Sequence, residues 1–167
     1  MAETEAWQRG AVDGVSGMLQ PVAHILLQVR ESVHEMVPGL SEAEWNARPR
    51  GVASAAFHVR HIAGVIDRLF TYARGEQLSK DQFTAKTREG SQLVLSEVPG
   101  LLDAFDKRID DAVDQLRQVD TSTLTDFRGV GQKQLPSTVI GCLVHGAEHS
   151  MRHVGQLWVT VRIVRGH

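Results

Sequence analysis

Two histidines near the C-terminal end of the chain have the spacing of metal ligands. His149 and His153 lie in the segment HSMRHVGQ, within a long apolar stretch. On an α-helix, residues i and i+4 share one face with Cβ atoms roughly 5 to 6 Å apart, so both imidazoles can reach one divalent ion. Two ligands do not complete a site, so at least one more must come from elsewhere in the chain.

A helix predicted over residues 136–164 carries this pair and a third histidine. On a helical wheel with about 100° per residue, His145 falls beside a polar arc, whereas His149 and His153 fall among apolar residues. Burying two imidazoles there is costly unless their nitrogens find partners. A metal ion would satisfy them, and hydrogen bonds to carbonyls or to a carboxylate are the alternative.

A second predicted helix, over residues 54–75, offers two candidates for the third ligand. In its segment FHVRHIAG, His58 points nearer the centre of the apolar face and His61 lies at the flank, so spacing alone leaves both open. Three imidazoles leave one coordination position free, as catalytic zinc sites do. Cys142, about two turns before His149, is poorly placed as a fourth ligand and is predicted to be a small buried hydrophobe.

Helical periodicity dominates the whole chain, and alternation with a period of two is scarce. Pro21 either kinks the first helix or marks a later start, and a capping box at Ser41 begins a short helix. Four glycines lie inside predicted helices, where they permit close approach of a neighbouring helix or leave backbone room near the site: Gly64, Gly141, Gly146 and Gly155. The predicted long helices cover residues 12–37, 54–75, 99–119 and 136–164, and the predicted loops cover 76–91, with a short turn at 79–83, and 120–134. We therefore expect an all-α fold, a four-helix bundle with long connecting loops, as a single domain over residues 1–167.

Charge and cysteine content exclude several classes of protein. Eighteen Lys and Arg residues oppose 20 Asp and Glu, and no block of like charge indicates a nucleic-acid or membrane partner. The single cysteine excludes an intrachain disulfide, and the first residues do not resemble a signal peptide. We therefore expect a cytoplasmic protein that binds neither nucleic acid nor membrane.

Two segments, SAAFHVRHIAG and EHSMRHVGQ, together with the order of long helices, resemble the DinB/YfiT-like metalloenzyme family over most of the chain. The resemblance implies a four-helix bundle with three histidine ligands. The family's ligand in the second long helix precedes an Ile-Ala or Leu-Ala pair, which selects His61 beside His149 and His153. It further implies a divalent transition metal ion such as zinc or nickel, and a homodimer. Val154 stands where family members often carry arginine.

Some proteins of this family transfer low-molecular-weight thiols, which leads to the first hypothesis for function. The chain would be a metal-dependent thiol S-transferase that joins such a thiol to an electrophilic small molecule. No catalytic residue beyond the ligands is assigned, since Glu148 lies about a quarter turn or more from both histidines of its helix. A second hypothesis is a stress-related protein that binds metal or a small ligand without turnover. A third is a dimeric bundle whose histidines only satisfy one another and backbone carbonyls.

Overall fold

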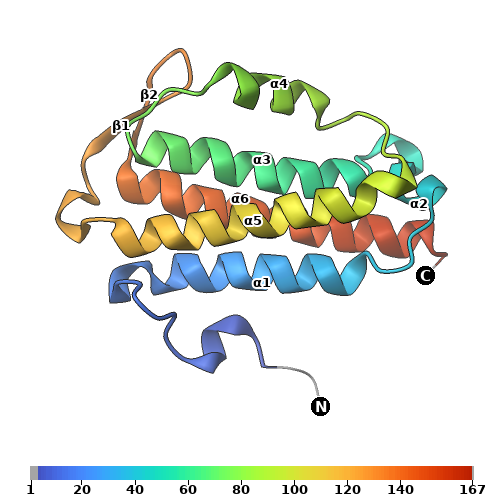
Figure 1. Cartoon of the computed structure of the whole chain (residues 1–167), viewed down its shortest axis with the longest axis horizontal. Coiled ribbons are helices and arrows are strands. Elements are labelled where there is room, and N and C mark those ends of the chain that lie inside the picture. The colour runs from blue at the N-terminus through green and yellow to red at the C-terminus, as the bar shows by residue number, and fades with distance from the viewer. Residues whose placement is uncertain (1–3, 167) are drawn as a thin grey trace.

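Helices make up most of the computed structural model, which describes residues 4–166 (Figure 1). The α-helices are α1 Gln20–Met36, α2 Glu42–Asn46, α3 Ala55–Ala73, α4 Lys80–Arg88, α5 Val98–Gln118 and α6 Val139–Val164. The strands are β1 Phe127–Val130 and β2 Leu135–Thr138. Short 3-10 turns occur at Ala6–Arg9, Gly17–Leu19, Pro49–Gly51, Leu95–Glu97 and Thr121–Thr123.

The four long helices, α1, α3, α5 and α6, lie side by side as a bundle (Figure 1). The contact between α3 and α6 is the most extensive one; α1 packs against α6, α5 packs against α3, and α1 and α5 contact each other. Apolar side chains from all four helices are fully buried between them: Leu26, Ile62, Ile66, Phe105, Ile109, Leu116, Leu143 and Leu157. The predicted bundle is therefore confirmed, and its two most closely associated helices are those that carry the candidate ligands.

Local sequence signals determine where several helices begin. The Ser41 hydroxyl accepts a hydrogen bond from the Glu44 backbone N–H at 3.3 Å, and the Glu44 carboxylate accepts one from the Ser41 N–H, which completes the predicted capping box. Ser54 caps α3 as predicted by accepting from the Phe57 N–H. The first long helix begins at Gln20 rather than at residue 12, because proline suits a first helical turn, whose N–H groups have no partner within the helix.

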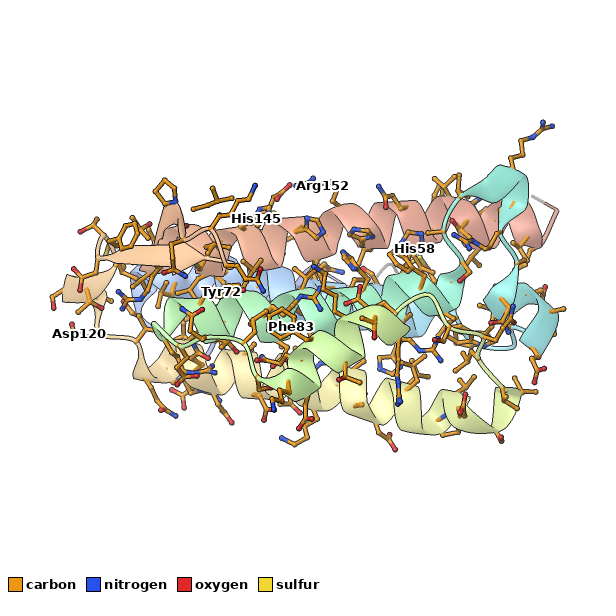
Figure 2. All side chains as sticks on the ribbon, turned by 90° about the horizontal axis from the view of Figure 1, so that it is seen from above. His58, Tyr72, Phe83, Asp120, His145 and Arg152 are labelled. Carbon is orange, nitrogen blue, oxygen red and sulfur yellow. The ribbon has the colours of Figure 1, made fainter. Side chains whose placement is uncertain are left out.

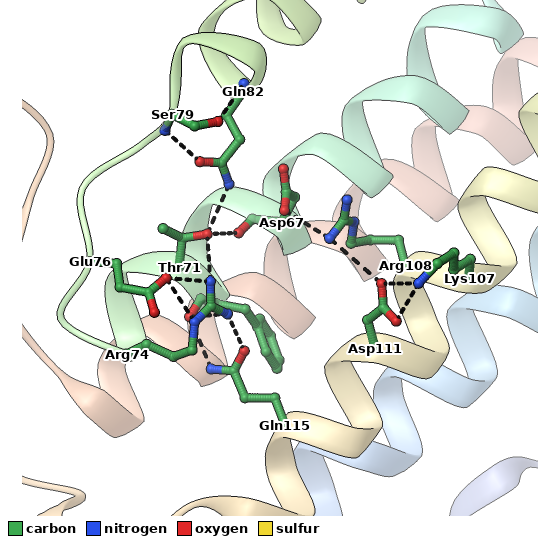
Figure 3. Close-up of polar contacts among 11 residues, drawn as sticks. Asp67, Thr71, Arg74, Glu76, Ser79, Gln82, Lys107, Arg108, Asp111 and Gln115 are labelled. Carbon is green, nitrogen blue, oxygen red and sulfur yellow. Dashed lines mark hydrogen bonds and ion pairs between the residues drawn. The ribbon is translucent and has the colours of Figure 1, made fainter.

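The segment 76–91, predicted as a loop, contains the helix α4. Its start is a capping box in which Ser79 and Gln82 exchange hydrogen bonds, and Figure 3 shows both beside Thr71 of α3. The Gln82 side-chain amide also donates to the Thr71 hydroxyl at 2.8 Å, which ties α4 to α3. The helix was missed because none of its residues but Phe83 has a large apolar side chain, so no apolar periodicity marks it.

The second predicted loop, residues 120–134, also contains regular structure. Strands β1 and β2 pair antiparallel, with Gly129 opposite Pro136, so the hairpin is a departure from an entirely α-helical fold. Strands of four residues are too short to show a clear alternation of apolar side chains. Because Pro136 belongs to β2, α6 begins only at Val139, where the Thr138 hydroxyl accepts from the Gly141 N–H.

Polar contacts attach α5 to α3 along one side of the bundle (Figure 3). Arg108 of α5 forms an ion pair with Asp67 of α3 at 2.8 Å. About two turns further, at the C-terminal end of α3, the Arg74 guanidinium donates to the side-chain oxygen of Gln115, whose amide donates to the Phe70 carbonyl. These contacts fix the position of α3 from the face opposite to the one on which the candidate ligands meet α6.

The apolar surface of the longest helix, α6, is interrupted by histidine, glutamate and arginine side chains. Within residues 4–166, no helix combines the length and the apolar character that crossing a membrane requires.

Candidate metal centre

Three histidines from two helices meet between α3 and α6. His61 comes from α3, and His149 and His153 are one turn apart on α6. Each offers one ring nitrogen, and these three nitrogens all lie within 4.8 Å of one another. The Nε2 atoms of His61 and His149 are 3.1 Å apart. The fold therefore brings together the three residues that the sequence and the resemblance selected, in a cluster consistent with a metal site.

Close packing of α3 against α6 makes this meeting possible. Gly146 lies one turn before Ser150 on α6, and a Cβ atom there would be only 3.3 Å from the Phe70 ring of α3. Ser150, which is fully buried, donates its hydroxyl hydrogen to the Gly146 carbonyl at 2.6 Å. A small residue at 146 therefore lets the two helices approach each other near the histidines, as predicted for this glycine.

A buried glutamate from outside the bundle helices supports His61. The carboxylate of Glu89, which follows α4, accepts a hydrogen bond from His61 Nδ1 at 2.7 Å and another from Arg68 at 2.7 Å. Burial, the largest effect, opposes ionisation of Glu89, but the hydrogen bonds from His61 and Arg68 and their charges together lower its pKa. Because a carboxylate only accepts, His61 Nδ1 carries a hydrogen, and in the neutral ring the lone pair is then on Nε2, the nitrogen that faces His149.

A second histidine of α3, His58, contacts His153 rather than joining the cluster. The Nδ1 atoms of His58 and His153 are 3.0 Å apart, so one ring donates to the other. When His153 is the donor, its Nε2 is free to bind a metal ion, and His58 has the place of an orienting partner. The two candidates that spacing left open on this helix thus occupy different positions, with His61 in the cluster and His58 behind it.

The environment keeps most of these rings neutral at pH 7. Burial first, and then the charge of His61, lower the pKa of His58 to about 4. Burial and the charges of the neighbouring histidines lower the pKa of His153 to about 4. The pKa of His149 is also lowered, chiefly by burial, and its buried Nδ1 has no hydrogen-bond partner among residues 4–166. Neutral imidazoles keep the lone pairs that metal binding requires.

The donor set fits a divalent transition metal ion, on the chemistry of the residues present. Three imidazoles converge, and the outward nitrogens of His61 and His153 have hydrogen-bond partners that orient the rings. Imidazole nitrogens bind zinc, nickel, copper and iron alike. Zinc or nickel, which we predicted, are therefore both compatible with the cluster.

A cavity of about 660 Å³ opens beside the cluster, and both His61 and His149 line it. It lies between α3, α4, the turn of the hairpin and α6, so the two segments predicted as loops form part of its wall. Its size suits a small molecule. A ligand in this cavity would lie directly against two of the three histidines.

The other polar residues of α6 that the sequence singled out lie outside the cluster. His145 has a side chain that is 54% exposed, whereas His149 and His153 are half-buried, which confirms the prediction that His145 is the most exposed histidine of this helix (Figure 2). Glu148 forms an ion pair with Arg152 on the surface. Cys142 is buried beside Ser137, and burial raises the pKa of its thiol, as expected for a small apolar residue.

Glu89 is the residue that sequence reasoning missed. It lies in a polar stretch that was predicted as a loop, where an acidic residue usually faces solvent, yet only 6% of its surface is exposed. Its only sequence signal is the capping box at Ser79, which predicts a helix ahead of it. That signal does not indicate that the carboxylate after this helix contacts side chains of α3.

Gly64, one turn after His61, leaves the space in which Glu89 and Arg68 meet. A Cβ atom at this position would lie 2.5 Å from Glu89 Oε1 and 2.7 Å from Arg68 Nη1. We expect Gly64→Ala to fold, since the clash involves the ends of two side chains and alanine favours a helix by about 1 kcal/mol over glycine. Displacement of the Glu89 carboxylate is expected to lower metal affinity roughly tenfold. Metal titration and thermal melting of the metal-free protein measure the two effects.

Gly155→Ala is the matched control for this change. It is also a helical glycine near the cluster, but a Cβ atom there would meet nothing within 4 Å. It should gain the same helix propensity and bind metal as the wild type does. Equal metal affinity of the two alanine variants would show that the Glu89 carboxylate does not support metal binding by orienting the His61 ring.

Comparison with known proteins matches most of the chain to a model of a protein family. The family model that matches is described as DinB superfamily and covers residues 25–157. This range contains the three clustered histidines and Glu89. No curated protein matches the chain.

Proposed function

Because the chain belongs to the DinB superfamily and gathers three imidazoles beside an open cavity, we propose that it is a metal-dependent enzyme that transfers a low-molecular-weight thiol to an electrophilic small molecule. The observation that carries this proposal is the convergence of His61, His149 and His153 at the wall of the cavity. Three protein ligands are characteristic of catalytic sites, in which a further coordination position is open.

His61, His149 and His153 would hold the ion, which we propose to be zinc or nickel. A divalent ion bound there lowers the pKa of a thiol that it coordinates and so supplies a thiolate nucleophile at neutral pH. The residues around the ligands orient them: Glu89 holds the ring of His61, and His58 holds the ring of His153. Orientation by such partners supports metal affinity, because it removes the cost of ordering each ring on binding.

The cavity provides the place for the two reactants to meet. In the proposed transfer, the thiol loses its proton to solvent, its sulfur forms a bond to the electrophilic carbon, and the leaving group departs with the bonding electrons. The protein contributes proximity, since both molecules must lie in one cavity next to His61 and His149. No carboxylate among residues 4–166 lies free beside the cluster to act as a general base, since Glu89 is occupied by Arg68 and His61, which favours thiol chemistry over hydrolysis.

Metal-loaded protein without an affinity tag tests the proposal. With one equivalent of zinc or nickel, we expect multiple turnovers of a small thiol such as cysteine with the model electrophile chlorodinitrobenzene, followed by absorbance of the thioether. Metal-free protein should show only the uncatalysed rate. Bound metal without turnover, across a panel of low-molecular-weight thiols and electrophiles, would instead support a metal- or small-ligand-binding protein. Failure to bind any divalent metal would reject both.

A further inference from the structure

The cavity beside the histidines has a distinctive distribution of charge. Its lining includes the cationic residues Arg68, Lys86 and Lys133 but neither aspartate nor glutamate. Arg68 is neutralised by its ion pair with Glu89. The two lysines come from α4 and from the turn of the hairpin, are exposed, and form no ion pair with any residue in 4–166. Two positive charges without an ion-pair partner in the described residues therefore line one cavity from two different segments of its wall.

The same cavity presents apolar surface to solvent. Phe83 of α4 is 45% exposed and Leu135 of β2 is 59% exposed, and both line the cavity near the lysines. Tyr72 of α3 lies deeper, with 7% of its surface exposed, and its hydroxyl forms no hydrogen bond within residues 4–166 (Figure 2). Exposed apolar side chains that border a cavity are typical of a surface that a ligand covers.

These observations together define a class of ligand. We propose that the cavity binds a small molecule with an apolar or aromatic segment and a carboxylate or phosphate group, with Lys86 and Lys133 as the residues that select the anion. The apolar segment lies against Phe83 and Leu135, and the remainder of the molecule reaches His61 and His149. The inference rests on the proposed function in that it names the charge of a reactant at the same site.

The lysines have an independent structural reason to act as selectors. They are carried by two segments, α4 and the hairpin, that lie over the bundle rather than within it. Neither lysine belongs to the apolar core. A lysine that neither packs nor forms an ion pair is free to bind a ligand anion. Attraction between an exposed lysine and a carboxylate is modest for each pair, so two lysines acting together are needed for a measurable preference.

A matched pair of thiols tests the proposal: para-mercaptobenzoate, which is anionic, and para-mercaptobenzamide, which is neutral and of similar shape. Calorimetric titration of metal-loaded protein at low ionic strength should show tighter binding of the benzoate. In the double variant Lys86→Gln and Lys133→Gln, the affinity for the benzoate should fall about five- to tenfold and that for the benzamide should be unchanged. Lys80→Gln, a change on α4 outside the cavity, is the control and should alter neither.

A second pair of probes separates this inference from the proposed function. Para-toluate and para-toluamide lack the thiol, so their relative affinity reports the charge preference of the cavity even in protein that holds no metal. A preference for toluate that the double variant loses supports the inference whether or not thiol transfer occurs. Equal affinities for both members of each pair, or a preference that the double variant retains, would overturn it while leaving metal binding and turnover intact.

Discussion

His153→Ala is expected to lower the affinity of the protein for zinc or nickel at least about a hundredfold. The change removes one of three converging imidazoles, and even the outer partners of metal ligands are each worth roughly ten- to a hundredfold in affinity. Removal of a ligand itself should therefore lower the metal affinity by more than removal of an outer partner does. Competition with a chromophoric chelator, on protein without an affinity tag, measures the change. His149→Ala should behave in the same way, since its Nε2 faces that of His61.

His145→Ala is the matched control for both ligand variants. It removes the same type of side chain from the same helix, one turn before His149, but His145 is half-exposed and lies outside the cluster. Its metal affinity should stay within about twofold of the wild type, as is usual for surface substitutions. Equal losses in all three variants, or no loss in any, would contradict a site made of His61, His149 and His153.

Glu89→Gln is the second change with a large expected effect, roughly ten- to a hundredfold in metal affinity. Glutamine keeps the size of the side chain but removes the negative charge that accepts from His61 Nδ1 at 2.7 Å. The ring of His61 then loses the partner that sets its tautomer and orientation. The change also leaves the guanidinium of Arg68, which is 11% exposed, without its counter-charge, so stability should fall as well.

Two measurements separate these effects of Glu89→Gln. Thermal melting of metal-free protein measures the loss of stability, and metal titration well below the melting temperature measures the loss of metal affinity. Glu148→Gln is the control, because this carboxylate also lies near a histidine but forms its ion pair with Arg152 on the surface. A variant at Glu89 that binds metal as tightly as the Glu148 control would show that the buried carboxylate serves the fold alone.

Most of the fold was predictable because its signals are local. Apolar periodicity located α3, α5 and α6, and serine caps located the starts of α2 and α3. The segments that were wrongly predicted as loops, α4 and the β-hairpin, have too few apolar residues to show a period. Their regular structure depends on contacts with the bundle, such as the hydrogen bond from Gln82 to Thr71. The homodimer and the identity of the thiol stay predictions.

The histidine pair was determined by the sequence itself, because residues four apart on an apolar helix must share a face. Helical spacing placed His149 and His153 together and His145 apart from them, and the structure agrees. The third member was selected from His58 and His61 only through the resemblance to a family. Both lie on the side of α3 that faces α6, and a difference of about 60° around the helix does not decide which ring reaches the neighbouring helix.

The surroundings of the cluster depend on how distant segments of the chain pack together. Glu89 is 28 residues from His61 along the chain, and Lys133 comes from a turn still further away, so no local spacing relates them to the histidines. Their positions follow from how α4 and the hairpin fold back over α3 and α6. The sequence thus determined which helix faces carry imidazoles, since that depends on local geometry, whereas the carboxylate and the lysines beside them depend on long-range packing.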